Sequence, residues 1–347
     1  MQVFLTGGTG FIGQPLTIAL MRRGWNVTVL VRKPTSPQAQ TLSKMGVRLA
    51  TGDVTDRESM RAAVNGVDLV VHNAGHYEYG VDQASKQRMH AINVTGTDNV
   101  LRLAYELGIP RTVYISTTQA FGETGRHERD ETFTRQAPCR TTYEQSKTDA
   151  HKVAHQYAQG GLPLIIVCPN AVTGPNDHSP WGYFLRLYLN RIMPPTGWSP
   201  NAIHGNVHVS DVAEGIALAA ENGRIDETYF LSGECLSFRE HLNYWSKRPG
   251  AFRPLVWLPA HLAALFFAPL EPLQRTLGLP AFISRETVVS GSTNWHYSSN
   301  KAKHELGWTH RSAEVMWFET IDRELELLHK RKGQRLIQRL KPLDIVD

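Results

Sequence analysis

The sequence is poor in cysteine. Only Cys139, Cys168 and Cys235 occur among 347 residues, and they lie far apart. An odd number of isolated cysteines supplies neither a disulfide framework nor the paired ligands of a zinc site. The sequence therefore predicts no metal centre, and it favours a reducing, cytoplasmic compartment.

Long hydrophobic runs are also missing. The strongest apolar stretch, residues 255–270, contains Pro259, His261 and Pro269 and is too short to span a bilayer. No basic segment with a cleavage site precedes the strand-like start at residues 2–5, so no signal peptide is expected. We expect the apolar stretch to form a buried or lid helix, and a weak peripheral contact with lipid is the alternative.

No strong charge of one sign is present. Lysine and arginine number 37 against 32 acidic residues, which gives a net charge of +5. Part of the excess lies in a basic tail, residues 329–347, which includes His329-Lys330-Arg331-Lys332, Arg335, Arg339 and Lys341. Such a tail could touch an acidic membrane or nucleic acid. We expect a solvated helix end instead, and no nucleic-acid partner.

What the sequence does contain is an alternation of strand-like and helix-like segments up to about residue 170. Strands are expected at 3–6, 26–31, 47–51, 69–73, 112–116 and 164–168, and helices at 14–23, 57–64, 91–107 and 143–159. This alternation predicts an α/β fold, a Rossmann-type doubly wound parallel sheet. The apolar strands lack polar alternation, as in a sheet covered on both faces.

Beyond residue 170 the pattern becomes irregular and rich in glycine and proline. We expect a core at residues 1–170 that recovers one strand and helix at about 205–222. Residues 171–204 and 223–328 are expected to form a smaller C-terminal substrate-binding lobe, followed by the basic tail.

A glycine-rich loop, residues 6–13, follows the first strand and opens the first helix. Gly7 suits the tight turn, Gly10 lets backbone approach a pyrophosphate, and Gly13 permits close helix–strand packing. The helix N-terminus offers free N–H groups to phosphates. The loop therefore predicts a dinucleotide site, to which we assign Gly7, Thr9, Gly10, Phe11, Ile12 and Gly13.

The residue after the second strand selects the cofactor. An acidic residue there binds the ribose hydroxyls of NAD, whereas a basic residue accommodates the 2′-phosphate of NADP. The sequence offers Arg32 and Lys33 and no acid, and an arginine can fork onto a phosphate. NADP is favoured, with NAD as the alternative.

Tyr143 and Lys147 lie four residues apart and share one face of a predicted helix. A phenol with a pKa near 10 is a poor acid–base group at neutral pH, but a nearby ammonium favours phenolate. Tyr143 would then exchange a proton with a carbonyl or alcohol oxygen. A second pair, Tyr297 and Lys301, has the same spacing, but Lys301 begins a late helix and Tyr297 precedes its cap.

These motifs resemble the extended short-chain dehydrogenases/reductases (the NAD-dependent epimerase/dehydratase superfamily), whose loop usually reads TGxxGFIG. The resemblance implies that further residues contact the cofactor, namely Asp53, Val54, Asn73, Ala74, Gly75, Tyr143, Lys147, Pro169, Ala171 and Val172. It also implies a hydroxyl that bonds the reacting oxygen five residues before Gly122. That residue is Thr117, with Thr118 as the alternative, and His208 and Asp211 are expected to be structural.

Within this superfamily the chain resembles the dihydroflavonol-reductase-like and 3β-hydroxysteroid-dehydrogenase-like branches. The matching segments are 73–75, 93–100 and 174–177. Nucleotide-sugar epimerases commonly carry an arginine where this chain has His204-Gly205-Asn206, and its loss weakens a nucleotide-sugar reading. Aromatic residues that suit an apolar ring follow: Phe184, Tyr188, Trp198, Trp257, Phe266 and Phe267.

The sequence thus predicts an NADP-dependent oxidoreductase that reduces a carbonyl, or oxidises the alcohol, of a small apolar substrate. The alternatives are a sugar epimerase or dehydratase that retains its nicotinamide cofactor, and a non-catalytic NADP-binding regulatory protein. A homodimer is left open.

Overall fold

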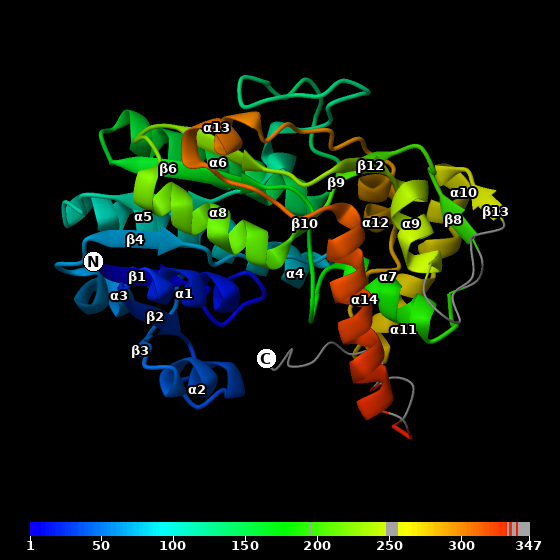
Figure 1. Cartoon of the computed structure of the whole chain (residues 1–347), viewed down its shortest axis with the longest axis horizontal. Coiled ribbons are helices and arrows are strands. Elements are labelled where there is room, and N and C mark those ends of the chain that lie inside the picture. The colour runs from blue at the N-terminus through cyan, green and yellow to red at the C-terminus, as the bar shows by residue number, and fades with distance from the viewer. Residues whose placement is uncertain (194–195, 248–255, 332, 335–337, 339–347) are drawn as a thin grey trace.

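The computed structural model describes residues 1–193, 196–247, 256–331, 333–334 and 338, and is shown in Figure 1. Its centre is a seven-stranded sheet in the order β11-β6-β5-β4-β1-β2-β3, in which every neighbouring pair is parallel. The strands are β1 (Gln2–Thr6), β2 (Asn26–Val31), β3 (Arg48–Thr51), β4 (Leu69–His72), β5 (Thr112–Ile115), β6 (Leu164–Pro169) and β11 (Thr228–Leu231).

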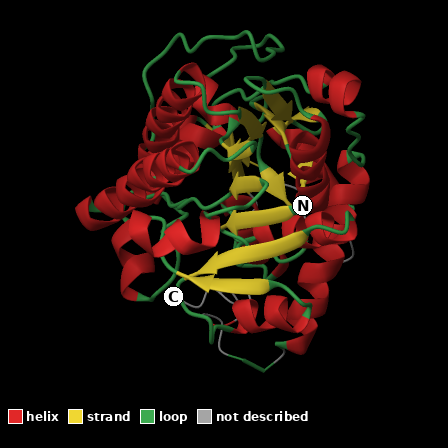
Figure 2. Cartoon of the chain, turned by 90° about the vertical axis from the view of Figure 1, so that its left-hand side faces the viewer, coloured by secondary structure: helices red, strands yellow, loops and turns green. Residues whose placement is uncertain are grey.

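Helices cover both faces of this sheet, as Figure 2 shows. One face packs against α1 (Gly13–Arg22), α2 (Pro37–Lys44), α8 (Val209–Asn222) and α13 (Asn300–Leu306). The other packs against α3 (Arg57–Val64), α5 (Gly96–Glu106) and α6 (Thr142–Gln159). The central strands β4, β5 and β6 are largely apolar and fully buried because helices cover both of their faces, whereas the edge strand β3 is exposed at both ends. The Rossmann-type fold predicted from the sequence is confirmed.

A smaller lobe stands beyond the carboxyl ends of the strands, at the right of Figure 1. A separate aromatic-rich core, which includes Trp198, Phe238, Trp245 and Trp317, holds it together. Its helices are α7 (Pro180–Leu189), α9 (Phe238–Ser246), α10 (Ala260–Phe267), α11 (Leu270–Thr276), α12 (Arg285–Gly291) and α14 (Ala313–Lys330). Its strands are β8 (Thr196–Trp198), β9 (Ile203–Gly205), β12 (Cys235–Ser237) and β13 (Val256–Leu258).

The strand that we expected near Val207 is not part of the central sheet. Residues Val207–His208 form β10, which pairs with β7 (Val172–Thr173), while the expected helix is present as α8. The seventh strand of the sheet is β11, which pairs with β6. The core therefore takes residues 228–231 from the segment that we assigned to the lobe.

Two helices and one irregularity were not expected from the sequence. The helices are α2 and α4 (Gln83–His90), both short and polar. The expected helix at 91–107 begins with a π-turn over Ala91–Thr95 and continues as α5. A 3₁₀ turn (Thr118–Phe121) follows β5. Tail residues 332, 335–337 and 339–347 lie outside the described residues, so the expectation for the basic tail is largely untested.

None of the helices in the described part of the chain is both long and apolar enough to cross a membrane. The apolar stretch after residue 255 instead forms β13, α10 and α11 of the lobe. Within the described residues, no group of three or more histidine, cysteine, aspartate or glutamate side chains is arranged to hold a metal ion.

Candidate active site

A cavity of about 1700 Å³ opens between the carboxyl ends of the strands and the lobe. This is the place where open α/β sheets bind ligands, and the volume exceeds the usual range for a single drug-sized ligand. The predicted site residues that line it are Gly7, Thr9, Gly10, Phe11, Ile12, Arg32, Asp53, Val54, Asn73, Ala74, Gly75, Thr117, Tyr143, Lys147, Ala171 and Val172. Gly13, Lys33 and Pro169 are not part of the wall.

The glycine loop has little room for side chains. Gly7 has a φ of +70°, and a Cβ there would lie 2.7 Å from the amide nitrogen of Ala74. A Cβ on Gly13 would lie 2.0 Å from the carbonyl oxygen of Gly7, so this glycine serves packing inside the loop. A Cβ on Gly10 would meet only the Gly7 oxygen, at 3.3 Å, and would otherwise point into open space.

The loop fits a dinucleotide phosphate. The backbone amides of Phe11 and Ile12 stand just before α1 and have no hydrogen-bond partner within the described part of the chain. Free amides at a helix N-terminus bind phosphate, because they donate hydrogen bonds and the helix dipole is positive there. Gly10 leaves the approach open. These residues would hold the pyrophosphate of the nicotinamide cofactor.

The end of the cavity next to β2, where we expect the adenosine of the cofactor, carries a cation. Arg32 is exposed, lines the cavity and has no ion-pair partner among the described residues. Asp53 uses its Oδ1 to accept hydrogen bonds from the amide and the hydroxyl of Thr55, each at 2.8 Å. Asn99 donates to the carbonyl of Val54 at 2.9 Å. The basic residue therefore faces the cavity, while Asp53 is engaged in its own turn.

A buried histidine connects the glycine loop to the strand beside it. The ring of His72 bonds Thr6 through Nδ1 at 2.8 Å and Thr97 through Nε2 at 3.0 Å. Thr6 also accepts from the amide of Ala74, at 3.1 Å. Burial first, and then the charge of Lys147, lowers the pKa of His72 to about 3, so this ring is neutral and structural.

Tyr143 faces a wall of aromatic rings. Its ring meets Tyr77 edge to face, with centroids 4.4 Å apart, and Tyr79 at 6.5 Å. Burial raises the pKa of Tyr143 above its usual value, while a hydrogen bond with Thr117 acts in the opposite direction. The phenol of the protein alone is therefore protonated at neutral pH.

Lys147 lies one helical turn further and is buried. Its ammonium donates to the hydroxyl of Tyr114 at 3.2 Å and to the carbonyl of Ile115 at 3.0 Å. It also stands 4.9 Å from the centre of the Tyr114 ring. The lowering of the Tyr143 pKa that we expect from Lys147 and an oxidised nicotinamide stays a prediction.

The two threonines after β5 have different surroundings. Thr117 lines the cavity, and its hydroxyl donates to the carbonyl of Pro169 at 3.3 Å. Thr118 is fully buried and is not part of the cavity wall. The structure thus places the hydroxyl of Thr117, rather than that of Thr118, on the cavity side.

The second tyrosine–lysine pair is not assembled. The hydroxyl of Tyr297 donates to the carbonyl of Gly122, while Lys301 forms an ion pair with Glu227 at 2.5 Å. Neither residue lines the cavity. His208 and Asp211 are also outside it: the ring of His208 caps α8 and Asp211 pairs with Arg311.

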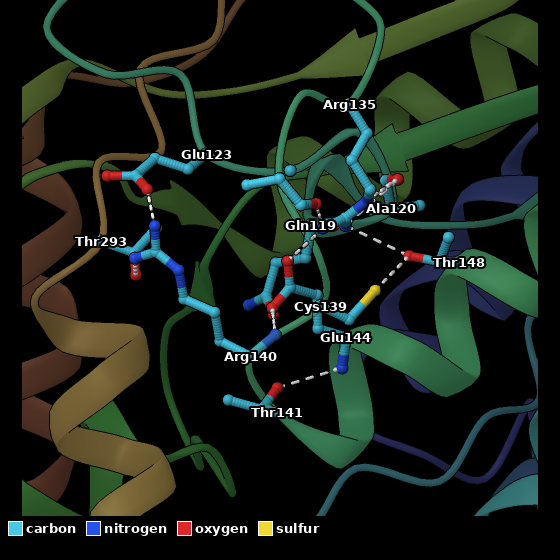
Figure 3. Close-up of polar contacts among 12 residues, drawn as sticks. Gln119, Ala120, Glu123, Arg135, Cys139, Arg140, Thr141, Glu144, Thr148 and Thr293 are labelled. Carbon is cyan, nitrogen blue, oxygen red and sulfur yellow. Dashed lines mark hydrogen bonds and ion pairs between the residues drawn. The ribbon is translucent and has the colours of Figure 1, made fainter.

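A buried ion pair that we did not predict supports the start of α6, the helix that carries Tyr143 and Lys147 (Figure 3). Glu144 follows Tyr143, and one of its oxygens accepts from Arg135 at 2.6 Å while the other accepts from the amide of Arg140 at 2.8 Å. The same Arg135 guanidinium donates to the carbonyl of Gln119 at 2.5 Å. It therefore joins the start of α6 to the turn that begins at Thr117.

Two further positioning contacts were also missed. Asn93, in the π-turn, donates to the hydroxyl of Ser146 at 3.0 Å and exchanges two hydrogen bonds with the backbone of His76. Glu286 of α12 accepts from the amides of Gly80 and Thr142 at 2.9 and 2.8 Å. Each contact joins segments far apart in sequence, and no local pattern indicates such pairs.

The substrate side of the cavity is rich in aromatic residues. Of those proposed from the sequence, Phe184 and Trp198 line the cavity, whereas Tyr188, Trp257 and Phe267 belong to the lobe core and Phe266 is exposed. Aromatic wall residues that we did not name are Tyr77, Tyr79, Trp181, Phe238, Trp245, Phe282 and Trp295. His204 also lines the cavity, and burial lowers its pKa to about 3, so it carries no charge.

Comparison with known proteins agrees with this geometry. Residues 3–231 match the model of the NAD dependent epimerase/dehydratase family. A Synechocystis sp. protein with the provisional name dihydroflavonol 4-reductase is 32% identical, over 91% of this chain and 94% of the relative. A Stigmatella aurantiaca protein named 4-hydroxy-2-methyl-3-oxo-4-farnesyl-3,4-dihydroquinoline-1-oxide ketoreductase is 28% identical, over 90% and 92%. The crystal structure of gox2253 has a TM-score of 0.77 at 30% identity and covers 98% of this chain and 99% of its own.

Proposed function

Because this chain belongs to the NAD-dependent epimerase/dehydratase family, we propose that it reduces a ketone of an apolar, ring-containing substrate with NADPH. It is an NAD(P)-dependent oxidoreductase of the extended short-chain dehydrogenase/reductase type. The reverse reaction would oxidise the alcohol. One observation carries this proposal: the Tyr143 phenol stands in a wall of aromatic rings, in the cavity that also holds Lys147 and the open glycine loop.

The protein residues supply the proton and the positioning. In the reducing direction Tyr143, protonated in its buried site, donates its proton to the oxygen that gains charge as the ketone is reduced. The hydroxyl of Thr117 stands on the cavity side and would bond the same oxygen. Lys147, held by Tyr114 and Ile115, would bind ribose hydroxyls and favour the phenolate left on Tyr143. The nicotinamide, when bound, supplies the hydride.

The apolar character of the substrate follows from the wall. Phe184, Trp198, Phe238 and Trp245 face the cavity from the lobe. The position at which nucleotide-sugar enzymes present an arginine is filled by His204, which is neutral and donates to the carbonyl of Gly291 at 3.1 Å. A neutral, engaged ring offers no charge to a substrate pyrophosphate, whereas aromatic surface favours an apolar ring.

The preference for NADP rests on Arg32. Its guanidinium is free of ion pairs in the described residues and lies at the adenosine end of the cavity, where the 2′-phosphate would be bound. An acidic residue in this place would favour NAD.

A ketoreductase function is also the activity named for the relative from Stigmatella aurantiaca. The two alternatives are an epimerase or dehydratase that keeps its cofactor between cycles, and a protein that binds NADP without turnover. The tyrosine, lysine and threonine in one cavity favour an enzyme over a regulator.

The test is the loss of NADPH absorbance with a panel of cyclic ketones, aliphatic ketones and sugar nucleotides. We expect steady consumption of NADPH with cyclic apolar ketones. Cofactor that stays bound through purification, with turnover of a sugar nucleotide and no net NADPH consumption, would favour the epimerase alternative. Tight NADPH binding without turnover of any substrate class would favour the regulatory one.

A further inference from the structure

Two consecutive helices of the lobe leave large apolar side chains in water. Leu265 is 68% exposed, Phe266 61% and Leu273 52%. Leu262 is also exposed, as is Leu277, which directly follows α11. These five residues, with the turn after Leu277, are called the apolar rim. Monomeric proteins rarely leave such side chains clustered at the surface without a partner.

Helix α10 has one exposed apolar face and one face packed against the lobe, as a helix at a membrane interface would. Leu262, Leu265 and Phe266 are spaced three and four apart, so they lie on one face of α10. The opposite face is packed: Ala263 is buried, and the ring of Phe267 stands 5.3 Å from that of Trp198. From Val256 to Leu270 the sequence contains no lysine, arginine, aspartate or glutamate.

The rim adjoins the wall of the cavity. Phe184 and Trp198, against which Phe267 packs, line the cavity. The turn that follows α11, at Gly278-Leu279-Pro280, also lines it. The exposed apolar surface of these two short helices therefore adjoins the cavity wall, through the packing of Phe267 at one end and through the turn after α11 at the other. Figure 1 shows α10 on the outer side of the lobe.

We propose that the apolar rim inserts into the surface of a lipid bilayer and that the substrate enters the cavity directly from the lipid. The surface itself is independent of the reaction, but the entry route rests on the proposed function, since an apolar ketone would be dissolved in the bilayer. An apolar helix face at the headgroup boundary is the usual form of such contacts.

A lipid surface fits the rim better than a second copy of the chain does. A second copy seated on α10 and α11 would also cover the turn at residues 278–280, which is part of the cavity wall. A fluid lipid surface would cover the same side chains and supply the apolar substrate at that place. The exposed face of α10 offers no charged side chain to a protein partner, since none occurs from Val256 to Leu270.

The test is flotation of the full-length protein with phosphatidylcholine vesicles, with no substrate present. We expect the native protein to float. The double variant Leu265→Asp/Phe266→Asp should bind at least tenfold more weakly. The matched control Tyr105→Asp/Val315→Asp places the same charges on two exposed apolar residues of α5 and α14, 52% and 45% exposed, and should float like the native protein.

Other outcomes would overturn the proposal. One is the absence of flotation with phosphatidylcholine. Another is binding restricted to anionic phosphatidylglycerol vesicles and unaffected by the rim variant, which would assign the contact to the basic tail. A third is a dimer, measured by light scattering, that the rim variant alone converts to a monomer, since the occupant would then be a second copy.

The controls separate this proposal from the proposed function. Circular dichroism and NADPH titration establish that the rim variant is folded. Flotation needs no turnover, whereas NADPH oxidation with a water-soluble cyclic ketone needs no vesicles. Flotation without reductase activity would leave the docking surface in place and refute the entry route. Activity without flotation would refute both the docking surface and the entry route, and would leave the proposed function standing.

Discussion

The guanidinium of Arg135 and the carboxylate of Glu144 meet at 2.6 Å in a buried pair beneath the first turn of α6. The side chains are 17% and 5% exposed, and Tyr143 precedes this glutamate. The same guanidinium holds the carbonyls of Gln119 and Ala120, just after Thr117. The pair therefore sets the distance between the two hydroxyls that would bond the reacting oxygen.

We predict that Arg135→Lys lowers kcat by about 10- to 100-fold, because a misplacement of about 1 Å at a reacting centre can have that effect. A lysine cannot reproduce the fork of donors. NADPH affinity, measured by fluorescence titration, should change little. The control is Arg140→Lys, whose pair with Glu123 is more exposed. An unchanged kcat in Arg135→Lys would refute the positioning role.

Tyr143→Phe should remove the proton donor and nothing else. We expect a loss in kcat of about 100-fold or more, the usual contribution of a general acid, with NADPH binding retained. Tyr297→Phe is the matched control, since it has the same spacing to a lysine but lies away from the cavity. It should cost about 1 kcal/mol of stability through its lost hydrogen bond and leave kcat unchanged. Equal activity losses in both variants would contradict the assignment.

Arg32→Asp should change the choice of cofactor. Loss of a charge-assisted contact to a phosphate weakens binding by about 10- to 100-fold, so the Kd of NADPH should rise by this factor while that of NADH changes little. Arg48→Asp, an exposed residue of β3, has the same effect on net charge and serves as the control. If both variants raise the Kd of NADPH equally, Arg32 contributes only through the net charge of the protein and not through a contact with the 2′-phosphate.

Two glycines of the loop should behave differently. Gly13→Ala places a methyl group 2.0 Å from the carbonyl oxygen of Gly7, so the loop must shift and the melting temperature should fall. Gly10→Ala meets that oxygen at 3.3 Å and should fold nearly normally. Its methyl would point where the pyrophosphate must lie, so NADPH binding should be lost. Normal NADPH affinity in Gly10→Ala would place the phosphates elsewhere.

The free energy of unfolding should fall as the pH is lowered from 7.5 to 5.5. Burial lowers the pKa of His72 and His204 to about 3 and that of His241 to about 4. The unfolded chain, with pKa values near 6.5, therefore binds protons in this range that the folded chain does not. Each of these histidines should cost about 1.4 kcal/mol of unfolding free energy at pH 5.5. At pH 6.5 the slope of this loss is about half a proton per histidine, and the loss vanishes only above about pH 7.5.

Urea unfolding at the two pH values measures this effect. In His241→Gln the difference in unfolding free energy between pH 7.5 and 5.5 should shrink by about 1.4 kcal/mol, the contribution of one histidine, whatever the absolute stability of the variant. An unaltered pH dependence in His241→Gln would show that this ring is protonated in the folded protein.

The sequence by itself determined the parts of this protein that depend on local patterns. The glycine loop, the apolar strands and the Tyr143–Lys147 spacing are properties of short segments. Their consequences depend on hydrogen-bond geometry over a few residues, and they led directly to the Rossmann-type fold and the family. The short polar helices α2 and α4 were missed because they present almost no apolar face to a pattern analysis.

Tertiary structure alone decided which distant residues meet. Asn93 reaches Ser146, Glu286 reaches Thr142, and β11 rather than the segment at Val207 completes the sheet. It also decided that Phe184 faces the cavity whereas Phe266 faces outward. Two phenylalanines of the same chemistry differ in burial because the packing of the lobe against the sheet decides which side chains are covered. A short segment of sequence carries no information about that packing.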